Sequence, residues 1–167
     1  MLFRSILLEI SIKQDGRPGG GGAPGPGPAG PRPARPGGRA GTNAGIPVSG
    51  VNVSRTKDVQ EEIVYKLAEA TAERCGVKGG IDRKNIVCFD GYVGPGYSLP
   101  TDSMVEAVKL LASTEGILLD PVYSGKAAAG LIDLVRKGHF AENSNVLFLH
   151  TGGSPALYAY LDTFRAK

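Results

Sequence analysis

Residues 119–126 read LDPVYSGK, and residues 146–153 read VLFLHTGG. Each stretch runs from apolar residues into small polar residues and glycine, a pattern typical of a buried strand that ends in a tight loop. In open α/β sheets, ligands bind beyond the carboxyl ends of the strands. The two stretches therefore predict a parallel sheet with a ligand site along its carboxyl edge.

The chain around these stretches alternates between expected strands and expected helices. Strands are expected at residues 46–53, 85–89, 117–119 and 146–150, which are short apolar or β-branched runs. Alternation of strands with helices favours an α/β fold, in which helices cover both faces of a parallel sheet to give three layers.

The expected helices are marked by caps and by apolar spacing. The first begins after Ser54 or Thr56 and stops at Gly76, and the second begins at residues 100–102. The third spans Gly125–Lys137, with Gly138 after its end, and the last spans Ser154–Phe164. Apolar residues recur at helical spacing in the first three, at Val59, Ile63, Leu67 and Ala70, at Met104, Val108 and Leu111, and, facing inward, at Ala129, Ile132 and Val135.

Composition divides the chain at residue 46. Residues 16–41 consist of 11 Gly, 7 Pro, 4 Arg and 4 Ala, which cannot build a core, so residues 1–45 are expected to be a disordered leader. Residues 1–45 carry a net charge of +4, so residues 46–167 carry −1 of the total of +3. Because no aromatic residues interleave the arginines of residues 16–41, no nucleic-acid partner is expected.

The N-terminal sequence and the cysteines bear on location. The apolar run at residues 1–12 is too short to span a membrane, so no membrane partner is expected. The only two cysteines, Cys75 and Cys88, lack metal-ligand or disulfide spacing, which fits a reducing compartment and predicts no metal site. We expect a cytoplasmic protein, with organellar targeting left open by the Arg-rich, acid-poor leader.

Three loops are the candidate site: residues 90–98, 120–126 and 150–154. They offer Tyr97 from the first, Tyr123 and Ser124 from the second, and His150 and Thr151 from the third. Tyr92 also projects from the first loop, and a tyrosine that only anchors its loop is the favoured interpretation for any one of these tyrosines. His150 is more simply explained as a strand-end residue than as a base. Lys126, just inside a helix, is expected to point to solvent. The sequence has no Walker loop, no dinucleotide-binding glycine motif and no Gly-x-Ser-x-Gly elbow.

Several linked motifs carry a family resemblance. Residues 90–135 (DGYVGPGYSLPTDSMVEAVKLLASTEGILLDPVYSGKAAAGLIDLV), 146–160 (VLFLHTGGSPALYAY) and 48–68 (VSGVNVSRTKDVQEEIVYKLA) resemble the C-terminal half of the D-cysteine desulfhydrase and 1-aminocyclopropane-1-carboxylate deaminase family. That resemblance implies an incomplete fold-type II enzyme domain, like tryptophan synthase β, at residues 46–167. It also implies pyridoxal 5'-phosphate as cofactor, a small amino-acid substrate, and a homodimer in intact members.

The resemblance also implies roles by position. Tyr97 and Tyr123 match catalytic tyrosines on the substrate side of the cofactor, where they assist proton movement. Thr151 and Gly152 match the cofactor-binding H-T-G-G loop, with the Thr151 hydroxyl near the pyridine nitrogen. Ser124 matches a cofactor-side position that is Glu in the cyclopropane deaminases and Ser or Thr in desulfhydrase-like members. Ser124 therefore favours β-elimination of D-cysteine to pyruvate, sulfide and ammonia.

The sequence departs from the family in one respect. The family's Schiff-base lysine lies in a Gly-Asn-Lys motif, and no lysine in these 167 residues follows Gly-Asn. Lys126 matches a different family position. The family's phosphate loop is expected upstream of Ile46. We therefore expect this chain alone to bind pyridoxal phosphate weakly and to be inactive. The alternatives are a cyclopropane-carboxylate deaminase and a non-catalytic fragment that acts only by association.

Overall fold

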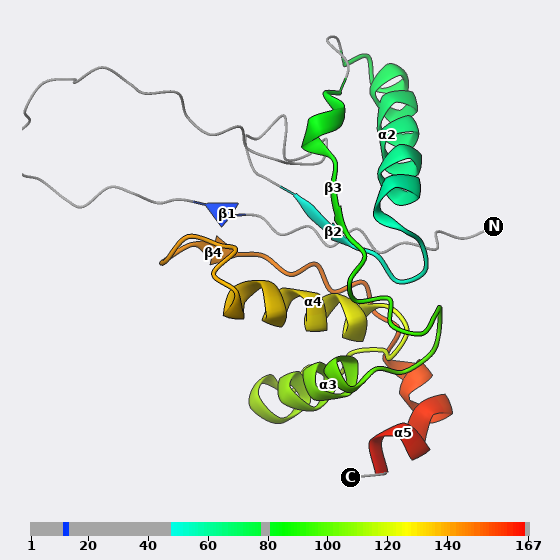
Figure 1. The fold of residues 1–167 in the computed structure, drawn as a ribbon, viewed down its shortest axis with the longest axis vertical. Helices are drawn as coiled ribbons and strands as arrows, with labels where there is room; N and C mark the ends of the chain where they lie inside the picture. The colour runs from blue at the N-terminus through cyan, green and yellow to red at the C-terminus, as the bar shows by residue number, and fades with distance from the viewer. Residues whose placement is uncertain (1–11, 14–47, 78–80, 166–167) are drawn as a thin grey trace, which may run out of the picture.

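A computed structural model describes residues 12–13, 48–77 and 81–165 of the chain. The elements in chain order are β1 (Ile12–Lys13), β2 (Ser49–Val51), α2 (Lys57–Arg74), the 3-10 helix η1 (Arg83–Asn85), β3 (Val87–Phe89), α3 (Asp102–Glu115), α4 (Ser124–Arg136), β4 (Asn145–Val146), the 3-10 helix η2 (Ser154–Tyr160) and α5 (Leu161–Arg165) (Figure 1). Apart from Ile12–Lys13, the leader expected to be disordered lies outside the described residues.

The sequence β2–α2–β3 forms a parallel crossover unit (Figure 1). Ser49 pairs with Val87 and Val51 with Phe89, as expected for two parallel strands joined by a helix. Thr56 occupies the N-cap position of α2, but its side chain makes no capping hydrogen bond. The backbone N–H of Lys57 instead donates to Asp90 Oδ2 at 2.7 Å. The loop after β3 therefore stabilises the start of the crossover helix.

Helices α3 and α4 pack against each other through a shared buried cluster. Met104, Ala107 and Val108 of α3 are buried in one cluster with Ala128 and Ala129 of α4. Thr101 caps α3 by accepting a hydrogen bond from the N–H of Met104 at 3.2 Å. Small residues at the start of α4 allow the two helices to approach closely, and this contact places the N-terminus of α4 beside the loops expected to hold a ligand.

Two of the expected strands are wrong or much shorter. Residues 117–119 form no strand, and the run 146–150 contributes only Val146, which with Asn145 forms β4. Strand β4 pairs antiparallel with β1, whereas a buried parallel strand was expected. Leu147, Leu149 and His150 are exposed. The physical reason is that a strand needs a neighbour for its hydrogen bonds, and within the described residues these runs have no neighbouring strand beyond β1.

Two expected helical faces also differ from the structure. The spaced residues Val59, Ile63 and Leu67 of α2 are exposed, and Val64, Tyr65 and Ala68 face the cluster around β3 instead. Val135, expected to face inward, is also exposed, whereas Ala129 and Ile132 contribute to the core. The last expected helix divides into η2 and α5. Apolar spacing identifies these helices, but the neighbouring elements decide which face they cover.

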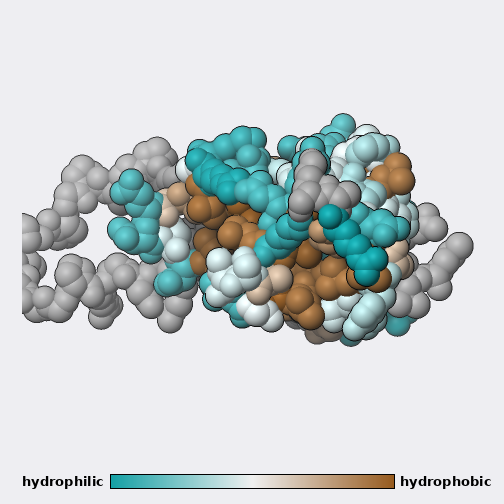
Figure 2. Space-filling view, turned by 90° about the horizontal axis from the view of Figure 1, so that it is seen from below, coloured by the Kyte–Doolittle hydropathy of each residue, from teal (hydrophilic) through white to brown (hydrophobic). Residues whose placement is uncertain are grey.

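Apolar residues reach other parts of the surface as well. Figure 2 shows hydrophobic residues gathered across the middle of the face seen from below Figure 1. Large apolar side chains with high exposure include Leu99, Leu118, Leu147 and Tyr158. None of the described helices is both long and apolar enough to cross a membrane.

Candidate functional site

The three loops expected to form a site meet at the N-terminus of α4. In Figure 1 the segment after β3, the start of α4 and the segment before α5 converge at the same end of α4. Side-chain contacts join them: Tyr97 bonds to Tyr123, Lys126 bonds to the first loop, and Gly153 lies against Asp120. The expected meeting of these loops is therefore found, although one of the strands expected to precede them is absent and another is reduced to β4.

The two predicted catalytic tyrosines share a hydrogen bond. The hydroxyl groups of Tyr97 and Tyr123 are bonded to each other, and either can be the donor. Their ring centroids lie 5.8 Å apart, and the rings meet edge to face at 63°. Tyr97 is 39% exposed, so the pair is open to solvent on one side. A hydrogen bond between two phenol oxygens holds two proton-bearing groups next to each other, as acid–base catalysis requires.

Tyr123 is held by a turn built around Asp120. This carboxylate is 2% exposed. Its Oδ1 accepts hydrogen bonds from the backbone N–H groups of Val122 and Tyr123 at 2.9 and 2.6 Å. Its Oδ2 accepts from the N–H of Ser124 at 2.7 Å. Asp120 therefore satisfies the unpaired N–H groups at the start of α4 and fixes the backbone that carries Tyr123.

Ser124 is part of the same turn. Its hydroxyl donates to Asp120 Oδ2 at 2.6 Å and accepts from the Asp120 N–H at 2.9 Å. The residue is 1% exposed. Both hydrogen bonds tie Ser124 to its own turn, one residue from Tyr123. A cofactor-binding role for Ser124 stays a prediction.

The H-T-G-G loop reaches the turn through its glycines. Gly152 and Gly153 adopt φ values of 90° and 94°, which side-chain-bearing residues rarely adopt. A Cβ atom on Gly153 would lie 3.0 Å from Asp120 Cβ and 3.2 Å from Asp120 Oδ2. Thr151, directly before these glycines, is exposed at the edge of the turn. Glycine is thus required for this loop to approach Asp120. The cofactor-binding roles of Thr151 and Gly152 stay predictions.

Lys126 corrects a prediction, because it does not point to solvent. Its side chain is buried with 0% exposure. The ammonium donates to the carbonyl oxygens of Val93 at 2.6 Å and Gly96 at 2.9 Å. Burial lowers the pKa of Lys126 below its ordinary value. The first turn of α4 packs tightly against other segments of the same chain. The long side chain of Lys126 therefore runs inward, where it reaches polar partners.

The first loop has two further ties. At one end, the Tyr92 hydroxyl donates to Asp133 Oδ2 of α4 at 2.6 Å. Burial and this carboxylate raise the pKa of Tyr92 to about 12. At the other end, the Tyr160 hydroxyl donates to the Ser98 carbonyl oxygen at 2.9 Å. The glycine-rich loop is therefore held to α4 and to η2 by side chains.

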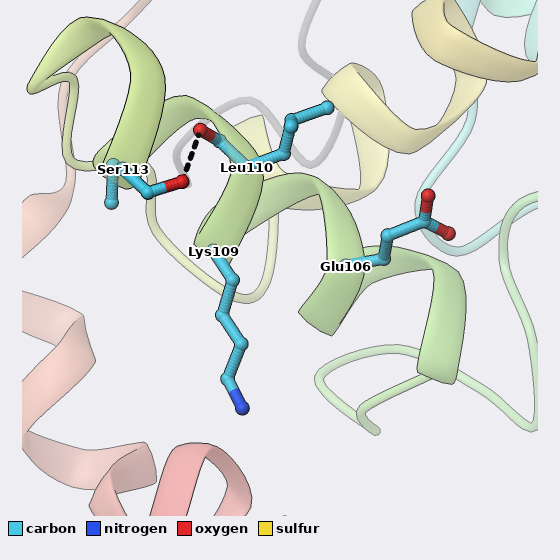
Figure 3. Close-up of a pocket in the computed structure, with 5 residues that line it drawn as sticks. Glu106, Lys109, Leu110 and Ser113 are labelled. Atoms are coloured by element: carbon cyan, nitrogen blue, oxygen red, sulfur yellow. Dashed lines mark hydrogen bonds between the residues drawn. The ribbon is translucent and has the colours of Figure 1, made fainter.

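A surface depression on α3 does not contain the predicted site. It is lined by Glu106, Lys109, Leu110, Ala112 and Ser113 (Figure 3). In Figure 3 the Ser113 hydroxyl donates to the Leu110 carbonyl oxygen, a bond of 3.0 Å within the helix. Neither tyrosine of the pair lines it. The described residues also contain no group of three or more His, Cys, Asp or Glu that could hold a metal ion.

Sequence reasoning missed the two residues that hold the site together. Asp120 could have been found as a capping residue, because Asp before a helix start commonly accepts backbone N–H groups. Lys126 could have been suspected from its setting in the run Gly-Lys-Ala-Ala-Ala-Gly, whose small residues indicate a close helix contact. Both signals are local, and neither states which distant loop the side chain reaches.

Comparison with known proteins identifies the family. Residues 36–152 match the family described as pyridoxal-phosphate dependent enzyme, a match that begins upstream of the boundary expected at residue 46. The chain is 46% identical over 134 residues to the D-cysteine desulfhydrases of Salmonella paratyphi C (strain RKS4594) and Salmonella choleraesuis (strain SC-B67). These matches cover 74% of this chain and 40% of each relative.

A solved structure gives the same result. The crystal structure of an ACC deaminase homologue matches with a TM-score of 0.61 and 35% sequence identity, over 71% of this chain and 34% of that chain. This similarity confirms the expected fold class, a fold-type II α/β domain, of which this chain spans a part. The chain belongs to the pyridoxal-phosphate-dependent enzyme family, as the motifs around Tyr97, Tyr123 and the H-T-G-G loop predicted.

Proposed function

We propose that this chain forms the substrate side of a pyridoxal-phosphate-dependent lyase that eliminates sulfide from D-cysteine. The Tyr97–Tyr123 hydrogen bond carries this proposal. It places two proton-bearing oxygens together at the edge of converging loops, where a substrate carbon needs a base and a leaving group needs an acid. One tyrosine, as the phenolate, accepts the proton from the substrate carbon and becomes a neutral phenol, and the partner hydroxyl stabilises the phenolate before the transfer by donating a hydrogen bond to it.

The described residues fit only one side of the cofactor. The tyrosine pair and the glycines of the H-T-G-G loop provide hydroxyl groups and close backbone approach. Among the lysines whose side chains the structure describes, none is placed for covalent attachment. Lys126 is engaged with loop carbonyls, Lys109 lies on the α3 surface, and Lys57, Lys66, Lys84 and Lys137 pair with neighbouring carboxylates. We therefore derive no chemical step through the cofactor and infer that the lysine for covalent attachment lies outside the described residues.

The preference for D-cysteine rests on Ser124 and on the curated relatives. Ser124 is buried against Asp120, so a longer acidic side chain at this position would bring two carboxylates together in a buried turn. The turn therefore supports the smaller residue that desulfhydrase-like members carry. The matched relatives named D-cysteine desulfhydrase point the same way, and the ACC deaminase homologue keeps the cyclopropane amino acid as the alternative substrate.

A chimera tests the activity. Residues 46–167 of this chain would replace the matching part of the Salmonella paratyphi C desulfhydrase, whose upstream part would supply the remainder of the enzyme. We expect sulfide release from D-cysteine, no ring opening of the cyclopropane amino acid, and a fall of about 10²–10⁴-fold in kcat for Tyr97→Phe or Tyr123→Phe. Tyr158→Phe is the matched control, because Tyr158 is 79% exposed.

Two results would count against the proposal. The first is a chimera that folds, binds cofactor and keeps its full kcat in both the Tyr97→Phe and the Tyr123→Phe variant. This result would show that the tyrosines take no part in the reaction. Preference for the cyclopropane substrate reassigns the specificity. The isolated chain provides a separate check, since we expect it to show weak pyridoxal phosphate binding by absorbance and no sulfide release. A stable absorbance band of bound cofactor would contradict that expectation.

A further inference from the structure

The position of Lys126 connects the two segments that carry the tyrosine pair. Lys126 lies in the first turn of α4, and its backbone is three residues from Tyr123, whose carbonyl oxygen accepts from the Ala127 N–H at 2.9 Å. Its ammonium holds the carbonyl oxygen of Gly96, the residue directly before Tyr97. One side chain therefore spans from the Tyr123 segment to the Tyr97 segment.

The loop that carries Tyr97 needs such a tie. Residues 91–96 include three glycines and one proline, and Gly94 adopts a φ of 67°. Tyr92 anchors the loop near its start and Ser98 near its end. Between these anchors, Lys126 holds the carbonyl oxygens of Val93 and Gly96, and the Gly96 carbonyl otherwise accepts only a long backbone hydrogen bond of 3.3 Å from the Leu99 N–H among the described contacts. Without Lys126, the glycine-rich backbone before Tyr97 can adopt many conformations, and no side chain among the described contacts holds it in place.

The burial of this ammonium is costly for a residue with only a packing role. A buried charged group has to be compensated by good hydrogen bonds, and this ammonium donates to two neutral carbonyl oxygens within the described part of the chain. An apolar side chain of similar length would fill the same space without that cost. The charge is therefore best explained by what it orients.

We propose that Lys126 is a positioning residue that sets the Tyr97–Tyr123 hydrogen bond by clamping the Val93–Gly96 backbone to α4. The role rests on the proposed function of the tyrosine pair, but the clamp itself is a property of this chain without cofactor or substrate. Lys126 acts through the loop backbone and does not contact the reacting atoms.

Nuclear magnetic resonance of the isolated chain labelled with ¹³C at the tyrosine Cζ atoms tests the clamp. Tyr97→Phe and Tyr123→Phe assign two of the six tyrosine signals and show where each signal moves when its partner hydroxyl is lost. We expect Lys126→Met to move both signals in those same directions and to leave Tyr65 and Tyr158 unchanged. Lys109→Met, an exposed lysine on α3, should move none of them.

The double variant separates positioning from a general effect on the fold. In Tyr97→Phe, the pair is already lost, so adding Lys126→Met should produce no further movement of the Tyr123 signal. Three results would overturn the proposal: a folded Lys126→Met variant with both signals at their wild-type positions, an equal movement of the Tyr123 signal with and without Tyr97, or a change spread over all tyrosines.

A second variant covers the case in which Lys126→Met does not fold. Lys126→Gln keeps a donor for one carbonyl but is shorter, and we expect it to fold and to move the Tyr97 and Tyr123 signals less than loss of the pair does. Unfolding of both variants would overturn the positioning role in favour of a purely structural one. Because these signals need no cofactor, a failed clamp leaves the chimera test of the lyase activity unaffected.

Discussion

Helices α2 and α4 differ in how much of their apolar surface is covered. Helix α4, with 13 residues, buries eight of them, the seven residues from Ser124 to Gly130 and Leu134. Helix α2, with 18 residues, buries only Gln60 and Ala72. Both helices show apolar residues at helical spacing in the sequence, yet that stripe is exposed in α2.

The difference comes from the elements that each helix contacts. Helix α4 packs against α3 on one side and against β2 and Tyr92 on the other, so small residues are needed on both. Helix α2 packs its partly buried apolar residues Val64, Tyr65 and Ala68 against the cluster around β3. An amphipathic pattern therefore indicates a helix, whereas burial depends on how many neighbours the fold supplies.

The sharpest test compares the same substitution in the two helices. Leu134 of α4 is 5% exposed and Leu67 of α2 is 49% exposed. Leu134→Ala removes buried methyl groups and leaves a cavity, so we expect a loss of about 2–5 kcal/mol in the free energy of unfolding. Leu67→Ala should change it by less than about 0.5 kcal/mol. Urea unfolding followed by circular dichroism measures both.

An equal loss for the two variants would break the comparison, since it would mean that the α2 stripe is covered in solution. Repeating the unfolding at several protein concentrations identifies the cover. A dependence on concentration assigns it to a second molecule, and independence assigns it to the same chain.

The sequence predicted the helices better than the strands for a physical reason. A helix makes its hydrogen bonds within one segment, so caps such as Thr101 and the αL residues Gly76 and Gly138 place its ends from local information. A strand makes its hydrogen bonds with another segment. Residues 117–119 and 146–150 have strand-like composition, but composition cannot supply the neighbour on which the ladder depends.

The site residues show the same difference between local and long-range information. Tyr97 and Tyr123 were found because family motifs mark them, and the structure brings their hydroxyl groups together. Lys126 was expected in solvent and is buried, because its environment is set by a loop 30 residues away. The long-range partner of a charged side chain is not encoded by helical position, and this is why the clamp could be seen only in the structure.

The next test concerns the polar turn at the start of α4. Asp120 accepts three backbone hydrogen bonds and one from the Ser124 hydroxyl while buried. Asp120→Asn puts an NH₂ group against these donors, so we expect a loss of about 1–3 kcal/mol in the free energy of unfolding. Asp58→Asn, in the exposed first turn of α2, should cost about 0.3–1 kcal/mol. Similar losses in unfolding free energy for both variants would mean that water takes over the hydrogen bonds that Asp120 accepts in the turn.

A third test probes the close approach of α3 and α4. A Cβ atom on Gly125 would lie 2.7 Å from the Asp120 carbonyl oxygen and 2.9 Å from Val108 Cγ2. Overpacking costs about 1–3 kcal/mol, and alanine gains about 1 kcal/mol over glycine within a helix, so Gly125→Ala should lose up to about 2 kcal/mol. Gly91→Ala, where a Cβ meets nothing within 4 Å, is the control in thermal unfolding. A stabilised Gly125→Ala would show that the helices separate easily.

The smallest expected effect belongs to the tie between Tyr92 and α4. Tyr92→Phe loses the hydrogen bond to Asp133, which should cost about 0.5–1.5 kcal/mol at neutral pH. The pKa of Tyr92 is raised to about 12 in the folded chain, from about 10 in a free tyrosine. Because the pKa is higher in the folded chain, the protonated Tyr92 hydroxyl contributes its full stabilisation below about pH 10. This contribution is lost as the pH rises towards 12.

The difference in unfolding free energy between the wild type and Tyr92→Phe should therefore be constant up to about pH 9 and decrease between pH 10 and 12. Urea unfolding at a series of pH values measures it, and Tyr158→Phe, at an exposed position, should show no such decrease. A difference that stays constant through pH 12 would mean that Tyr92 is as accessible to water in the folded chain as in the unfolded one. The loop would then be held to α4 chiefly by Lys126. This result would sharpen the contrast between α4, with its buried polar contacts, and α2, which buries only Gln60 and Ala72.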